Sequence, residues 1–193
     1  MLLRDAATFD LAVKVRTPRG ATIGEVFSFL SGLYFRGKLG YAQAFENPPR
    51  RVRGSWVITT DRGLVPPDTH VTAQDLRAMG EQPIDCDDPK YCEPLKRSVH
   101  ELAKRIGRAD CEVVLLGSIA TGKYIDTLHA ALGERLKFPT EFVGRGDMSR
   151  GGLLLRCVRE SRQLTYVPIN GSTRHGIRPP KLVPIPGILK SAR

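Results

Sequence analysis

Residues 111–133 read CEVVLLGSIATGKYIDTLHAALG, and this stretch decides the expected fold. The apolar run at residues 111–117 is typical of a buried strand. A glycine-containing loop follows it, and residues 124–132 have the periodicity of a helix that Gly133 would close. A strand that passes through a short loop into a helix is the repeating unit of α/β folds.

Further strands are expected where apolar residues alternate or cluster, at residues 11–16, 55–60 and 164–169. Helices are expected at residues 22–33 with a capping box at Thr22, and at 34–45, 73–79, 94–106 and 153–161. Strands therefore alternate with helices along most of the chain. This order predicts a three-layer, Rossmann-like α/β fold with a mainly parallel sheet and helices on both faces.

The length of 193 residues fits a single domain. We expect residues 1–169 to form one α/β domain. Residues 170–193 are basic and rich in proline and glycine, so we expect an extended tail packed on that domain.

The formal net charge is +10, and it is unevenly spread. Residues 144–193 carry ten basic and two acidic side chains, an excess of eight positive charges. Clustered lysine and arginine attract phosphate, so the predicted partner is a phosphate-bearing ligand, either a nucleotide or a nucleic acid. The alternative is that the excess charge only keeps the protein in solution.

No apolar run approaches the roughly 20 residues that cross a bilayer, and the first ten residues contain acids where a signal peptide would be basic and apolar. We therefore expect no membrane association and a cytoplasmic location. Cys86 and Cys92 are the only closely spaced cysteine pair, and the four histidines share no ligand spacing, so no metal site is expected. The cofactor is unknown at this stage.

The loop after the strand at residues 111–117 has the G-x-x-x-x-G-K spacing of a phosphate-binding loop. Glycines let backbone N–H groups surround an anion at a helix N-terminus, and the lysine adds a charge. A tyrosine stands where the magnesium-binding serine or threonine would be, which favours a phosphate loop without magnesium. An ordinary strand-to-helix turn is the alternative. The predicted ligand-binding residues here are Gly117, Ser118, Thr121, Gly122, Lys123 and Tyr124.

A second glycine-rich segment, GRGDMSRGG at residues 144–152, is expected to be a loop before a helix. Its arginines could grip phosphate, and Asp147 could accept a ribose hydroxyl or act as a catalytic base. The alternative is a flexible surface loop in which Asp147 caps the helix. The predicted ligand-binding residues are Arg145, Gly146, Ser149, Arg150 and Gly151.

Aromatic and basic residues alternate at residues 34–45, YFRGKLGYAQAF, where Tyr34 and Arg36 are predicted ligand contacts. Such a segment could stack bases and neutralise phosphates, although an amphipathic core helix fits equally. It ends at NPPRRVRG, residues 47–54, with two prolines and three arginines. Asp61 follows the strand at residues 55–60, where site residues of α/β proteins collect, and is a second candidate catalytic carboxylate.

Three segments together, LYFRGKLGYAQAF, WVITTDRGLVPPDT and VVLLGSIATGKYIDTL with GRGDMSRGG, resemble a group of small bacterial α/β domains of unknown function. These are distantly similar to the accessory α/β domain of archaeal tRNA-guanine transglycosylase and archaeosine synthase. The matching positions are Tyr34, Arg36, Gly63, Leu64, Gly117, Tyr124, Gly144 and Gly146. The Cys-Ser-Lys turn common in that group is missing here. The resemblance implies a nucleotide or nucleic-acid context.

Two hypotheses follow. The first is an enzyme that acts on a nucleotide, nucleoside or modified base, of the glycosidase or transferase type, with Asp61 and Asp147 as acid or base. The second is a noncatalytic RNA- or DNA-binding module that uses the basic C-terminal third.

Overall fold

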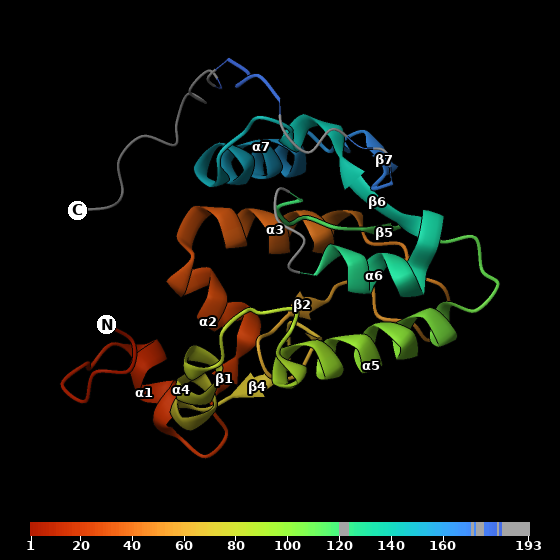
Figure 1. Cartoon of the computed structure of the whole chain (residues 1–193). Coiled ribbons are helices and arrows are strands. Elements are labelled where there is room, and N and C mark those ends of the chain that lie inside the picture. The colour runs from red at the N-terminus through yellow and green to blue at the C-terminus, as the bar shows by residue number, and fades with distance from the viewer. Residues whose placement is uncertain (120–123, 171, 173–175, 181, 183–193) are drawn as a thin grey trace.

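The computed structural model describes residues 1–119, 124–170, 172, 176–180 and 182, and within them the chain is mainly helical (Figure 1). The helices are α1 (Asp10–Arg16), α2 (Ile23–Leu30), α3 (Gly32–Phe45), α4 (Ala73–Glu81), α5 (Pro89–Ile106), α6 (Ile125–Leu132) and α7 (Asp147–Arg159). The strands are β1 (Ala21–Thr22), β2 (Val57–Ile58), β3 (Leu64–Val65), β4 (His70–Val71), β5 (Val113–Val114), β6 (Leu136–Pro139) and β7 (Tyr166–Pro168). Two 3₁₀ turns, η1 (Gly133–Arg135) and η2 (Thr140–Phe142), flank β6.

The prediction of a three-layer, Rossmann-like fold with a mainly parallel sheet is wrong. The described strands form three small sheets, of which β1–β4 and β2–β3 are two-stranded and antiparallel. The third sheet has the order β5–β6–β7, with a parallel β5–β6 pair and an antiparallel β6–β7 pair. The strand–loop–helix–strand unit from β5 through α6 to β6 is therefore present, but it is not repeated along the chain.

The segment at residues 11–16 shows why the sequence pattern predicts too many strands. Its apolar and basic residues alternate, yet it forms α1, in which Ala12 and Val15 are fully buried three residues apart. Three residues are close to one helical turn, so the same letters also satisfy a helical period. The Arg16 side chain stabilises helix α1, because its Nε donates to the Ala12 carbonyl at 2.8 Å and its Nη1 to the Asp5 carbonyl at 2.9 Å.

Several helix ends follow the sequence closely. Thr22 begins α2 with the expected capping box, in which the Glu25 carboxylate accepts a hydrogen bond from the Thr22 N–H at 2.9 Å. Hydrogen bonds from Lys14 and Thr22 lower the pKa of Glu25 to about 2. Gly133 ends α6 as expected. By contrast, α5 begins at Pro89 rather than at the expected Pro94, which lies inside the helix.

The apolar residues form two clusters. The larger one combines α5, α6 and α7 with the three-stranded sheet, and its buried members include Leu95, Phe138 and Leu154. The smaller one combines α1, α2 and α4 with β1 and β4. Helix α3 belongs to both, because Tyr41 is buried in the larger cluster and Phe35 packs against the smaller one. In the described chain no helix combines the length and the apolar character that a bilayer crossing requires.

Helices α3 and α7 lie against one another at two glycines (Figure 1). A Cβ atom placed on Gly37 would lie 2.7 Å from the Gly151 carbonyl oxygen, and one on Gly151 would lie 2.7 Å from the Leu33 carbonyl oxygen. Both contacts are with backbone atoms, which cannot move aside as a flexible side chain does. The crossing therefore requires glycine at both positions.

This geometry predicts that Gly151→Ala lowers the free energy of unfolding by about 1–3 kcal/mol, because the added methyl group overpacks the crossing. Gly152→Ala is the matched control, since the nearest atom to its Cβ is Leu182 Cδ1 at 3.6 Å. That substitution is expected to be neutral or stabilising by up to about 1 kcal/mol, because alanine is the better helix former. Urea unfolding of both variants measures the difference, and equal stabilities would contradict the packing assignment.

Candidate functional site

A cavity of about 500 Å³ lies between α3 and the facing elements, namely the β2–β3 hairpin, α5 and the β5–α6 segment. Its lining draws on both apolar clusters. The aromatic side chains in its wall are Phe27, Phe35, Tyr41, Phe45, Trp56, Tyr91, Tyr124 and Tyr166. A volume of this size, with mostly apolar walls and a few polar groups, is typical of small-molecule sites.

Lys38 brings a positive charge to the cavity wall. Its Nζ lies 4.2 Å from the centre of the Tyr34 ring and 5.6 Å from that of Phe35, so the ammonium rests on aromatic faces. Burial lowers the pKa of Lys38, an effect that the Asp147 charge partly opposes. Among the described residues Lys38 forms no salt bridge. A desolvated cation without a carboxylate is a site that an anionic ligand would complete.

Tyrosine hydroxyls are among the other polar groups of the wall, which also include Arg53 and the carboxylates of Glu46 and Glu112. Tyr91 is 2% exposed, and its hydroxyl has no hydrogen-bond partner in the described part of the chain. Burial raises the pKa of Tyr91 to about 12, so the hydroxyl stays protonated and can donate a hydrogen bond. The Tyr41 hydroxyl, in contrast, accepts from the Leu164 N–H at 2.8 Å and contacts the Tyr166 hydroxyl. Among the described residues the Tyr91 hydroxyl is therefore a buried donor without an acceptor.

The loop after β5 contributes two of its predicted residues to the wall, Gly117 and Tyr124. The Tyr124 hydroxyl donates to the Ser118 carbonyl at 2.8 Å, and a Cβ on Gly117 would lie 2.7 Å from that hydroxyl. The tyrosine at the magnesium-ligand position is thus hydrogen-bonded to the backbone of Ser118, near the end of β5. Thr121, Gly122 and Lys123 lie outside the described residues.

The second glycine-rich segment is only partly the expected loop, because α7 already begins at Asp147 with Gly146 as its N-cap. Gly151 consequently lies inside the helix against α3. Arg150 turns back and donates from Nε and Nη2 to the Phe142 carbonyl at 3.3 and 3.1 Å. Arg145 donates to the Glu141 carbonyl at 3.0 Å and to Ser149 Oγ at 3.2 Å. Neither arginine lines the cavity.

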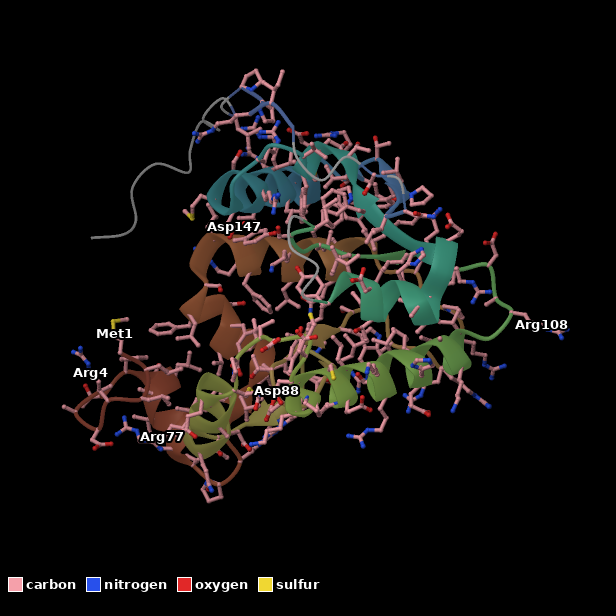
Figure 2. The ribbon with its side chains drawn as sticks, viewed as in Figure 1. Met1, Arg4, Arg77, Asp88, Arg108 and Asp147 are labelled. Carbon is pink, nitrogen blue, oxygen red and sulfur yellow. The ribbon has the colours of Figure 1, made fainter. Side chains whose placement is uncertain are left out.

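Strand β2, which precedes Asp61, and helix α7, which begins at Asp147, lie below and above α3 in the view of Figure 1. Asp61, in the turn of the β2–β3 hairpin, pairs with Arg62 at 3.2 Å, and Arg62 also bonds the Asp75 carboxylate of α4. Asp147 begins α7, where its side chain is 69% exposed and lies 3.6 Å from Arg150 Nη1 (Figure 2). The structure does not bring the two together as an acid–base pair.

The two ligand contacts predicted on α3, Tyr34 and Arg36, have different surroundings. The Tyr34 hydroxyl donates to the Leu116 carbonyl at 3.4 Å, and burial raises its pKa against the opposing effect of Arg150. The Tyr34 ring makes the cation–π contact with Lys38. Arg36 is exposed and does not line the cavity. Lys38, which shares the same aromatic and basic pattern, is the cation that does.

We compared the chain with models of known protein families, with curated proteins and with solved structures. It matches none of them. Within the described residues no group of three or more histidine, cysteine or acidic side chains is arranged to hold a metal ion. The function is therefore inferred from the geometry of the cavity.

Sequence reasoning missed the cavity and the role of Tyr91. The alternation of aromatic and basic residues at 34–45 was the available signal for one wall, and it did not distinguish Lys38 from Arg36. No local pattern marked Tyr91, because its apolar surroundings come from segments distant in the chain.

We expect Tyr91→Phe to leave the stability of the ligand-free protein unchanged or to raise it by up to about 1 kcal/mol, because it removes a buried hydroxyl that has no partner. Tyr41→Phe is the matched control. It should cost about 1 kcal/mol, since the Leu164 N–H loses its acceptor. Chemical denaturation of the two variants measures the difference. A clear loss of stability in Tyr91→Phe would mean that its hydroxyl is already satisfied.

Proposed function

We propose that the protein binds a nucleotide, with the base inside the aromatic cavity and a phosphate on Lys38. The observation that carries the proposal is a half-buried ammonium group on the wall of a cavity of about 500 Å³, which forms no salt bridge within the described residues. Because the charge has lost part of its hydration, an anion at this place gains a strong electrostatic interaction.

The walls suit a nucleobase. Aromatic side chains stack on bases of any sequence, and Trp56, Phe35 and Tyr124 offer such faces at the cavity. The free hydroxyl of Tyr91 supplies a hydrogen bond to a polar edge of the base. The net charge of +10 favours the approach of phosphate from solution.

A glycosidase or transferase reaction on the bound nucleotide extends this proposal. Such chemistry needs a carboxylate, and we assign that role to Asp147, which begins α7, the helix that contacts α3 at Gly37. Asp147 itself is not part of the cavity lining. Asp61 is engaged by Arg62. A cytoplasmic location, where nucleotides are abundant, belongs to the same proposal.

The test is calorimetric titration of the protein with the common nucleoside monophosphates, with the corresponding nucleosides and with inorganic phosphate. At least one monophosphate should bind, and Lys38→Met should weaken it by about tenfold or more, since the variant cannot form the charge-assisted hydrogen bond to phosphate. Arg36→Met is the matched control, because Arg36 is an exposed cation on the same helix. It should bind as the wild type does.

The proposal fails if no monophosphate binds the wild-type protein, or if the two variants lose the same affinity. Circular dichroism confirms that both variants are folded. Removal of the half-buried charge in Lys38→Met is expected to leave the ligand-free protein at least as stable.

A further inference from the structure

An arginine-rich loop forms part of the cavity rim. We call residues 47–54, NPPRRVRG, the arginine loop; it connects the end of α3 to the strand β2. Val52 and Arg53 contribute to the cavity lining, while Arg50 and Arg51 are exposed and do not. The loop thus lines the cavity with one part and presents two arginines to solvent with the other.

The tip of the arginine loop is a tight turn that favours glycine, yet an arginine occupies it. The Val52 N–H donates to the Pro49 carbonyl at 3.0 Å, and Arg51 between them has a φ of 67°. A left-handed residue at the third position of such a turn is ordinarily glycine or asparagine. Arginine there is strained, and a strained non-glycine residue of this kind is typical of functional sites.

The charges of the loop are unequally engaged. Arg53 pairs with Asp68 at 2.7 Å, and the nearby Glu46 carboxylate accepts from the Ser55 hydroxyl at 2.5 Å. In the described part of the chain neither Arg50 nor Arg51 forms a salt bridge. Two free guanidinium groups therefore lie at the rim, where they can receive anions that the cavity itself does not hold.

The two sets of cations are well separated. Lys38 and Phe45 lie seven residues apart on α3, and both line the cavity, which corresponds to about 10 Å along the helix axis. The arginine loop begins beyond Phe45. A mononucleotide with its single phosphate on Lys38 leaves Arg50 and Arg51 unused, so these two are available to further phosphates of the same ligand.

From this geometry we infer that the ligand is the end of a single-stranded nucleic acid. Its terminal nucleotide occupies the cavity with the terminal phosphate on Lys38, and the following phosphates lie on Arg50 and Arg51. This rests on the proposed function and extends it from a free nucleotide to a polynucleotide. A duplex end does not fit, because its terminal base is paired and stacked, whereas the cavity requires a base that is free to enter.

The experiment measures the affinity of the full chain for a length series of 5′-phosphorylated single strands, with one, four and eight nucleotides, in RNA and in DNA form. The wild type should bind the octanucleotide more tightly than the mononucleotide. The double variant Arg50→Gln, Arg51→Gln should lose about tenfold or more in octanucleotide affinity and far less for the mononucleotide. The slope of log affinity against log salt should fall by about 1.4, at about 0.7 for each phosphate of a single strand that the variant no longer neutralises.

The matched control is Arg77→Gln with Arg108→Gln, two exposed arginines on α4 and just beyond α5 (Figure 2), neither of which lines the cavity. It has the same change in net charge and should keep the wild-type length dependence. A second variant, Arg51→Gly, separates folding from binding. It should raise the melting temperature, because glycine relieves the strain at φ 67°, while it lowers octanucleotide affinity.

The outcomes distinguish the two proposals. If the mononucleotide binds but the octanucleotide binds no better, or if the arginine-loop variant keeps its octanucleotide affinity and salt slope, the polynucleotide inference is overturned and the nucleotide site stands. Equal binding of a blunt duplex also overturns it. If neither the mononucleotide nor the octanucleotide binds, both proposals fail. A preference for RNA or for DNA supports the inference and identifies the sugar.

Discussion

The absence of two side chains, at Gly37 and Gly151, is the constraint on which the site depends. It lets the backbones of α3 and α7 touch, where any Cβ atom would meet a carbonyl oxygen at 2.7 Å. Helix α3 is held by α7 on this side, and its remaining surface is left to face the hairpin and α5. Phe35, Lys38 and Tyr41 of α3 line the cavity, so the position of this wall follows from the backbone contact between the two helices.

The cavity exists because the chain forms two apolar clusters rather than one. Helix α3 spans both, with Tyr41 buried in the larger cluster and Phe35 packed on the smaller. The space between two separately packed cores is a common place for ligand sites, because neither core can fill it without losing its own packing. Lys38 and Tyr91 both line this space. Within the described residues Lys38 has no salt bridge and the Tyr91 hydroxyl has no hydrogen-bond partner. Polar groups without partners lower the stability of a protein, and they are commonly found at binding sites.

Several local features could be predicted from the sequence. The capping box at Thr22 follows from hydrogen bonds between residues three apart, and Gly133 ends α6 through its own backbone freedom. The fold class could not be predicted in the same way. The apolar runs at residues 55–60 and 111–117 pair only through Val57–Ile58 and Val113–Val114, and neighbouring residues of both runs line the cavity. Apolar character indicates burial, and it does not say whether the burial is in a sheet.

The sequence by itself determined the start of α2 at Thr22, the end of α6 at Gly133, the aromatic and basic alternation on α3, and the turn-forming arginine loop, since each depends on residues close together in the chain. Only the tertiary structure decided that Gly151 serves helix packing, that Arg145 and Arg150 bond backbone carbonyls of η2, and that Lys38 rather than Arg36 reaches the cavity. Glycine and arginine have the same local signature in a phosphate loop and in a helix crossing. Which role they take depends on partners from distant segments, whose approach is set by the packing of the whole chain.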